Sequence, residues 1–119
     1  MKAVLSLSLF LSLFSSTIYA IPRFIPAIDT CRIPTLITPN DDGQNDDLII
    51  PCLPKDISAN KSELFVFNEW GERVTYNKPY LNDWHGTYKS QPLPDGTYFY
   101  IFRLNPSTEP QRGYITIFR

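Results

Sequence analysis

The chain has one histidine, two cysteines and no concentrated run of basic residues among its 119 residues. Nucleophilic catalysis needs a base beside the nucleophile, and His85 is the single histidine available. We expect it to be a surface or turn residue. Eleven Lys and Arg stand against twelve Asp and Glu, so no basic stripe is visible that would neutralise nucleic-acid phosphates. The composition argues against both an enzyme and a nucleic-acid-binding protein.

Long hydrophobic runs are missing except at the N-terminus. Lys2 precedes an apolar stretch over residues 3–14 that only serines interrupt, and small residues follow up to Ala20. The stretch is shorter than the roughly 20 apolar residues that span a bilayer. We therefore predict a signal peptide over residues 1–20, cleaved after Ala20, and export through the inner membrane with no transmembrane segment left afterwards.

Residues 21–34 contain three prolines and no periodicity, and we expect an extended lead-in to one small domain over residues 35–119. The two cysteines are Cys31 and Cys52. Because exported proteins meet an oxidising compartment, a disulfide between them is favoured over two free thiols or a metal pair. Such a bridge contributes on the order of 3 kcal/mol.

Helical periodicity is absent from every window of ten or more residues, and only residues 55–61 could hold one turn of helix. Short runs rich in aromatic and β-branched residues predict strands instead. They cover residues 48–50, 63–67, 73–76, 97–104 and 113–118. With turns between them and 11 prolines in the chain, they predict a single antiparallel, immunoglobulin-like β-sandwich of about six or seven strands.

The strand predicted over residues 97–104 follows a Leu-Pro-Asp-Gly turn. Alternation places Tyr98, Tyr100, Phe102 and Leu104 on one face, and Phe99 and Ile101 on the other. Both faces are apolar enough to be covered, which is the pattern of an interior strand.

An acidic turn precedes the first apolar run of the domain. The residues that alternate in it are Asn40, Asp42, Gln44 and Asp46, with Gly43 at the sharp bend. Their oxygens could hold a calcium ion, although the bidentate Glu of an EF-hand is missing. Asx-turns that lead into a strand would select the same residues with no ion, and this second interpretation is favoured.

Two tryptophans, Trp70 and Trp84, each lie near a glycine at the end of a predicted strand. If exposed, they could stack on sugar rings or contact a partner. We expect both to be buried at the corners of the sandwich, because large aromatic side chains are mostly buried.

Five segments together resemble the gliding-motility-associated C-terminal domain. They are Ile37–Asp46, Phe67–Tyr76, Asn82–Thr87, Leu93–Tyr100 and Gly113–Arg119. Each segment alone is a weak signal, but their order and spacing match the family over residues 35–119. The chain departs from the family pattern at His85, where an acid is usual, and in the short lead-in, where a large passenger is usual.

The resemblance implies a type B C-terminal sorting domain of the type IX secretion system. Such a domain is exported to the periplasm, is recognised by translocon proteins at the outer membrane, and ends as a secreted or cell-surface protein. We expect recognition to use Tyr114, Ile115, Thr116, Ile117, Phe118 and Arg119. Residues expected to set the shape of the domain are Trp70, Gly71, Trp84, Gly86, Pro94, Asp95 and Gly96.

The sequence therefore predicts a free-standing, non-enzymatic domain that directs type IX secretion or surface attachment. The alternative is a calcium-dependent adhesive or glycan-binding surface module that uses the acidic turn and one exposed tryptophan. A degenerate fragment with no function of its own is a third possibility.

Overall fold

The computed structural model describes residues 17–20 and 31–119, and residues 31–119 form an all-β domain with one short 3₁₀ turn, η1. The predicted signal peptide, apart from residues 17–20, and residues 21–30 of the lead-in lie outside the described residues. The elements are β1 (Leu36–Ile37), η1 (Ile57–Ala59), β2 (Glu63–Phe67), β3 (Arg73–Asn77), β4 (Thr87–Tyr88), β5 (Gln91–Pro92), β6 (Gly96–Arg103) and β7 (Gln111–Ile117).

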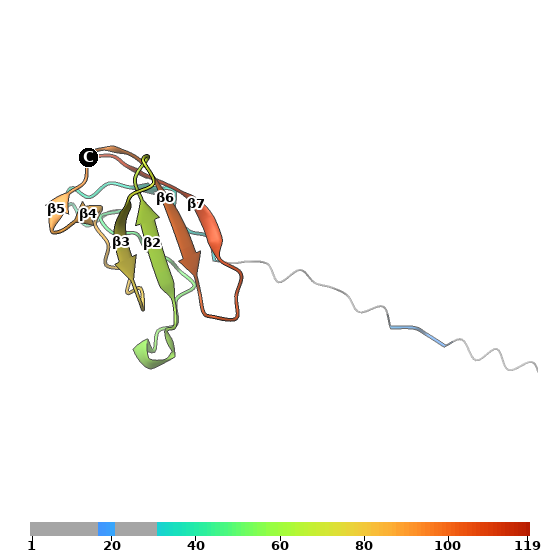
Figure 1. The fold of residues 1–119 in the computed structure, drawn as a ribbon. Helices are drawn as coiled ribbons and strands as arrows, with labels where there is room; N and C mark the ends of the chain where they lie inside the picture. Colours follow the sequence, from blue (N-terminus) through green and yellow to red (C-terminus); the bar gives the residue numbers. More distant parts are fainter. Residues whose placement is uncertain (1–16, 21–30) are drawn as a thin grey trace, which may run out of the picture.

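Five strands form the main sheet in the order β1-β7-β6-β2-β3, and β4 pairs with β5 in a separate hairpin (Figure 1). The predicted hairpin of residues 63–76 is confirmed as β2 and β3, and η1 confirms the single helical turn. The prediction of purely antiparallel pairing is wrong at one edge, because β1 runs parallel to β7. β1 is the first strand in the sequence and β7 is the last, so no hairpin connects them and their pairing can be parallel.

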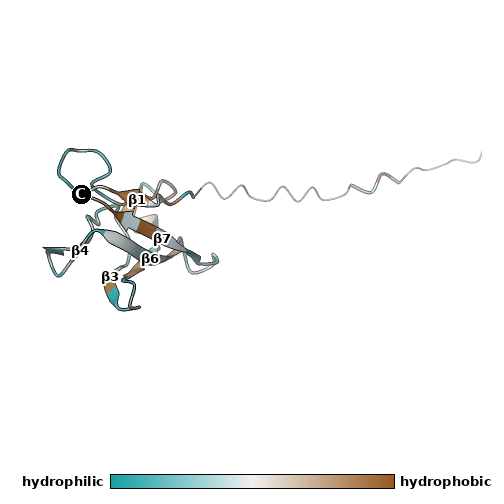
Figure 2. Cartoon of the chain, turned by 90° about the horizontal axis from the view of Figure 1, so that it is seen from above, coloured by the Kyte–Doolittle hydropathy of each residue, from teal (hydrophilic) through white to brown (hydrophobic). Residues whose placement is uncertain are grey.

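One face of the sheet carries the hydrophobic core. Alternation along the strands directs Leu64 and Val66 of β2, Phe102 of β6, and Ile115 and Ile117 of β7 inward, where each is almost fully buried. Tyr98 and Tyr100 are also buried, as the alternation predicts. Figure 2 shows hydrophobic stretches in β1 and β7 and hydrophilic residues in β4. The alternating pattern therefore fixes which face of each strand is internal.

The outer face of the sheet is open. β6 lies between β7 and β2, so its interior position in the sheet is confirmed. The prediction that both faces of this strand are covered is wrong, because Phe99 is 49% exposed. An aromatic residue pairs well across strands even when nothing covers it, so apolar alternation on both faces does not require two covering layers.

Irregular segments cover the inner face. The strand predicted over residues 48–50 is wrong: Leu48 and Ile50 are fully buried, but no strand forms there. The Leu48 N–H donates to the Trp84 carbonyl at 3.0 Å. The Ile50 N–H donates to Asn82 Oδ1 at 2.8 Å. A loop and a side chain thus satisfy this backbone in place of a neighbouring strand.

Tyr80 is the centre of a buried polar network beneath the sheet. Its hydroxyl donates to the Leu48 carbonyl at 2.6 Å and accepts from the Trp84 N–H at 3.3 Å. Its own N–H donates to Ser62 Oγ, and its carbonyl accepts from Asn60 Nδ2. Burial raises the pKa of Tyr80, so the hydroxyl keeps the proton that it donates.

The predicted disulfide joins Cys31 to Cys52, with a Cα–Cα distance of 5.0 Å. Cys31 and Ile33 both belong to the buried core, so the segment just before β1 is part of the domain. The bridge connects that segment to the loop that follows Ile50 and holds both over the inner face.

Replacing Tyr80 by Phe is expected to lower the free energy of unfolding by about 2 kcal/mol, because the Leu48 carbonyl and the Trp84 N–H would be left buried and unpaired. Urea denaturation measures the loss. The matched control is Tyr98→Phe, which removes one hydrogen bond, to the Pro94 carbonyl, at a partly buried position. Equal midpoints for the two variants would contradict a central role for Tyr80.

Candidate recognition site

The predicted recognition segment, residues 114–119, lies on β7 and the two residues after it, between β6 and β1. Its side chains alternate. Ile115 and Ile117 are buried in the core, and Thr116 is half-buried. Tyr114 is 52% exposed and Phe118 is 64% exposed. Tyr114 and Phe118 therefore present the large exposed side chains of the segment, whereas the Arg119 side chain is 27% exposed and the two isoleucines hold the strand in place.

Arg119 connects the end of this segment to the β4–β5 region. Its Nη1 donates to the Leu93 carbonyl at 2.5 Å and to Asp95 Oδ1 at 3.2 Å. Its Nη2 donates to the Gly86 carbonyl at 3.3 Å, and its backbone N–H donates to Asp95 Oδ2 at 3.2 Å. The guanidinium spreads its donors over separate nitrogens in one plane, so it reaches acceptors that lie too far apart for the single nitrogen of an ammonium group.

Gly86 allows the chain to approach β7 closely. A Cβ added to this residue would lie 2.9 Å from Ile117 Cδ1, and its φ of +72° is one that side chains disfavour. Its carbonyl accepts hydrogen bonds from both the Leu93 N–H and Arg119. The glycine is therefore required where the β4–β5 region meets the end of β7.

Trp70 lies on the turn between β2 and β3 and is 78% exposed, so the prediction that it is buried is wrong. Asn68 shapes this turn, because its Oδ1 accepts from the N–H groups of Trp70 and Glu72. Gly71, with a φ of +78°, completes it. The local hydrogen bonds determine the turn, and they direct the indole away from the core.

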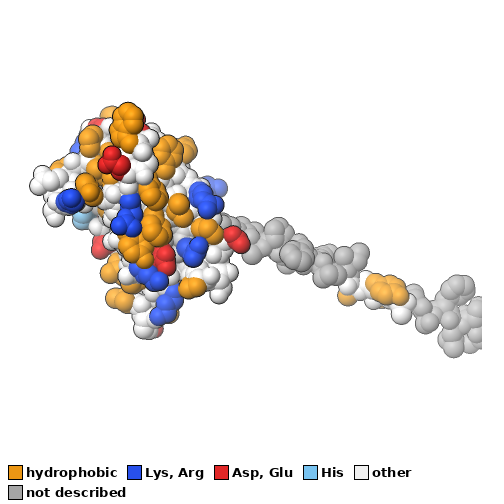
Figure 3. Space-filling view, viewed as in Figure 1, with side chains coloured by type: hydrophobic (Ala, Val, Ile, Leu, Met, Phe, Trp, Pro, Cys, Tyr) orange, Lys and Arg blue, Asp and Glu red, His pale blue; other side chains and the backbone are white. Residues whose placement is uncertain are grey.

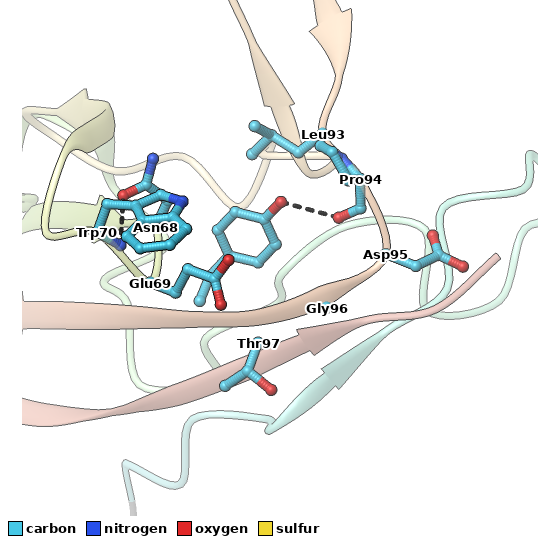
Figure 4. Close-up of a pocket in the computed structure, with 9 residues that line it drawn as sticks. Asn68, Glu69, Trp70, Leu93, Pro94, Asp95, Gly96 and Thr97 are labelled. Carbon is cyan, nitrogen blue, oxygen red and sulfur yellow. Dashed lines mark hydrogen bonds between the residues drawn. The ribbon is translucent and has the colours of Figure 1, made fainter.

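The turns around Trp70 and Asp95 enclose a small pocket of about 210 Å³. Figure 4 shows Asn68, Glu69 and Trp70 on one side and Leu93, Pro94 and Asp95 on the other. A typical small-molecule site occupies about 300–1,000 Å³, so this pocket is undersized for one. The Tyr98 hydroxyl donates to the Pro94 carbonyl at 2.8 Å across its floor. Pro94, Asp95 and Gly96 thus act as a structural turn that starts β6.

Trp84 is 5% exposed, which confirms its predicted burial. Its Nε1 donates to the Thr87 carbonyl at 3.0 Å, so the one polar atom of the indole has a partner. His85, beside it, is exposed as predicted and pairs with Asp47. The tryptophan anchors the loop to the core, and the histidine lies on the outside of the same loop.

The acidic turn is organised around Asp46. Its Oδ1 accepts the N–H groups of Asn40 and Asp41, at 3.0 and 2.9 Å, and its Oδ2 accepts that of Gly43 at 2.7 Å. Asp42 Oδ1 accepts the Gln44 N–H at 2.8 Å. Desolvation acts to raise the pKa of Asp46, but these N–H donors outweigh it and hold the pKa below its ordinary value.

This geometry is that of an Asx-type turn, because the carboxylate of Asp46 accepts three backbone N–H groups. Residues 17–20 and 31–119 contain no group of three or more His, Cys, Asp and Glu side chains that could hold a metal ion. Calcium binding by Asn40, Asp42, Gln44 and Asp46 stays a prediction.

The structure is that of an all-β domain whose last strand lies inside the main sheet. The chain belongs to the CHU_C family, the type IX secretion signal domain, whose profile matches residues 31–117. No curated protein and no solved structure matches the chain. The suspected sorting-domain family is thereby confirmed.

A signal of this type implies interaction with the secretion system, export, and a secreted or cell-surface location. The family is one of secretion signals and not of enzymes. Within the described residues, no helix is long and apolar enough to cross a membrane.

Sequence reasoning missed the buried polar residues that support this site. Asn60 Oδ1 accepts from both the N–H and the hydroxyl of Ser62, and both residues are buried. The signal was available as an Asn-x-Ser motif just before the strand Glu63–Phe67, but such residues are usually exposed. Arg119 and Asp95 were each predicted as site residues, but the sequence did not indicate that they contact each other.

Replacing Arg119 by Ala is expected to lower stability by only about 1 kcal/mol, because its hydrogen bonds are partly exposed. The larger effect is local. Amide hydrogen exchange should speed up at Thr116 and Phe118, whose N–H groups bond to the carbonyls of Thr35 and Ile37. Arg119→Lys is the control that keeps the charge, and it should restore protection only in part. The hydrogen bonds from Arg119 to Leu93, Asp95 and Gly86 are named the Arg119 clamp here. Unchanged amide exchange in both variants would show that this clamp does not hold the end of β7.

The Asp46 carboxyl is expected to titrate below its ordinary value of 3.8 in an NMR pH titration. Because the pKa is lower in the folded state, the ionised form stabilises the turn above the unfolded pKa, and this contribution is lost as the pH falls through the folded pKa. Asp46→Asn should remove the acid-dependent change in the Gly43 amide signal. A midpoint above 3.8 would contradict the hydrogen-bonded turn.

Proposed function

We propose that this chain acts, without catalysis of its own, as a C-terminal sorting domain that directs type IX secretion or surface attachment. The observation that carries the proposal is the family match, which spans residues 31–117 and therefore the whole described β-domain. The signal peptide over residues 1–20 supplies the first step, export to the periplasm. Translocon proteins at the outer membrane are the proposed partners.

The proposed mechanism is recognition of the folded surface around the end of β7. Tyr114 and Phe118 are the large exposed side chains of that segment, and the Arg119 side chain is 27% exposed. Ile115 and Ile117 act indirectly, since their burial fixes the strand from which the other residues project.

Strand addition is a physical route to such recognition. In the described part of the chain, β1 pairs only with Thr116 and Ile117 of β7. In this parallel register Leu36 lies opposite Thr116, and the Thr116 N–H also donates to the Thr35 carbonyl, so the chain before β1 continues alongside β7. The edge strands of the main sheet are β1 and β3. An extended segment of a translocon protein could pair along one of these edges through main-chain hydrogen bonds.

The immunoglobulin-like class is part of the same proposal. The five-stranded sheet, with β4 and β5 and the irregular segments over its inner face, supports a sandwich whose second layer is mostly loop. The short pairings β1–β7 and β4–β5 are the parts that depart from a regular second sheet.

A reporter protein inserted between Ala20 and Cys31 tests the function in a gliding host. We expect the reporter outside the outer membrane in the wild type and in the periplasm of a strain that lacks the type IX translocon. Replacing Tyr114, Phe118 and Arg119 together by Ser should trap it in the periplasm. Trp70→Ala, a large truncation at an exposed site, is the matched control. Periplasmic retention of the unmodified fusion in both strains would overturn the proposal.

A further inference from the structure

The open face of the main sheet carries two rows of side chains in register across four strands. The first row runs Arg73, Phe67, Phe99 and Tyr114, from β3 through β2 and β6 to β7. The second row runs Tyr76, Phe65, Ile101 and Arg112 in the same direction. These eight residues, which we name the outer strip, are all exposed or half-buried. Exposed apolar side chains that are contiguous in this way indicate an interaction surface, because they add nothing to the core on the inner face.

The outer strip is bordered by positive charge. Arg73 and Arg112 end the two rows at opposite edges, and a third row places Arg103 opposite Glu63. Lys78 pairs with Glu63 at 2.9 Å, so this acid is already engaged. Figure 3 looks onto this side and shows hydrophobic side chains with Lys and Arg beside them. The sequence separates these cations, and the register of the strands brings them onto one face.

The positive charge is a local concentration, because the chain as a whole carries one more acid than base. The face carries Arg73, Lys78, Arg103 and Arg112 against Glu63 and Glu69, which leaves two more cations than acids and favours an acidic partner. Two copies of this chain joined through the strip would bring like charges together. From strand spacing, the strip measures about 260 Å², well below the roughly 800 Å² per partner of a stable interface. An acidic peptide segment is compatible with both the positive charge and the small area of the strip.

The orientation of the rings distinguishes a peptide from a sugar or a nucleobase. Phe65 and Tyr76 stack on neighbouring strands with ring centroids 4.6 Å apart and an interplanar angle of 29°. Rings that face each other across one strand spacing stand upright on the sheet and present their edges outward. Arg73 lies 5.6 Å from the centroid of Tyr76, on that same ring system. Sugars and bases stack on ring faces, whereas apolar side chains fit between upright rings.

A groove of about 530 Å³ crosses the strip and is lined by Phe67, Phe99, Ile101, Arg112 and Tyr114. Glu69 also lines it. The groove gives apolar side chains a place to enter, with Arg112 beside them to pair with a carboxylate. Its lining is mostly apolar and contains two charged residues, Arg112 and Glu69, which is compatible with a peptide-binding surface that combines an apolar centre with polar groups.

We propose that the outer strip binds an extended acidic segment of a partner protein, with large apolar side chains in the groove and Asp or Glu side chains on Arg73 and Arg112. The surface shares Tyr114 with the segment proposed for export. Peptide binding in solution does not depend on export, so the two proposals can fail separately.

The probe is a synthetic peptide with a central Leu-Phe-Leu-Phe segment flanked by glutamates, titrated into the purified chain. Amide NMR shifts should change on β2, β3, β6 and β7 and leave the acidic turn unchanged. A peptide with lysines in place of the glutamates should not bind. The double variant Arg73→Glu and Arg112→Glu should bind about tenfold more weakly or worse. Phe99→Ser should weaken binding with no change of charge.

The control is Lys55→Glu, compared with each single variant Arg73→Glu and Arg112→Glu. Lys55 is exposed in the loop before η1, so its charge reversal should leave the affinity unchanged. Far-ultraviolet circular dichroism checks that each variant is folded. A loss in the Lys55→Glu control equal to that in the single variants would show attraction by net charge alone and overturn the proposal. So would shifts mapped to the acidic turn, or binding of polygalacturonate or an oligonucleotide to the strip in place of the peptide.

Discussion

The need to hydrogen-bond irregular backbone inside a core is the constraint on which this domain depends. Its sheet has no second regular layer on the inner face, so loops that contain Leu48, Ile50 and Trp84 cover it. Every N–H and carbonyl buried there needs a partner that a strand ladder would otherwise provide. Tyr80 and Asn82 supply those partners from side chains. The position of the β4–β5 hairpin, and through it the Arg119 clamp, follows from how this loop layer is held.

The two faces of the sheet perform different tasks because they meet different surroundings. The apolar side chains of the inner face form the core and stabilise the fold, and the buried Ile115 and Ile117 hold the last strand in place. The aromatic rows of the outer face remain exposed or half-buried. Tyr114 on β7 and Phe118 directly after it are both exposed. One strand thus contributes alternate residues to the core and to surfaces available for recognition. A substitution on β7 is therefore expected to affect stability or binding according to its parity along the strand.

Much of the fold could be predicted from the sequence, because the strands at residues 63–67 and 97–104 have strong alternation and clear turns before or after them. The disulfide followed from cysteine count and compartment. The parallel pairing of Leu36–Ile37 could not be predicted, since two residues carry no periodicity. The predicted burial of Trp70 was wrong because the general tendency of tryptophan to be buried takes no account of the turn that Asn68 forms with its hydrogen bonds. The basic outer strip was invisible for a similar reason: register across four strands, not proximity in sequence, brings Arg73 and Arg112 onto one surface.

The pairing of β1 with β7 has a consequence for the order of events during synthesis. These strands come from opposite ends of the domain, and β7 is the inner neighbour that joins β1 to the rest of the sheet. The sheet cannot be completed until the residues of β7 have left the ribosome and, for an exported chain, the inner-membrane channel. Contacts between distant segments also form slowly. The domain would therefore stay unfolded while it passes through that channel. Its surfaces would form only after export, on the side of the inner membrane where the secretion system recognises them.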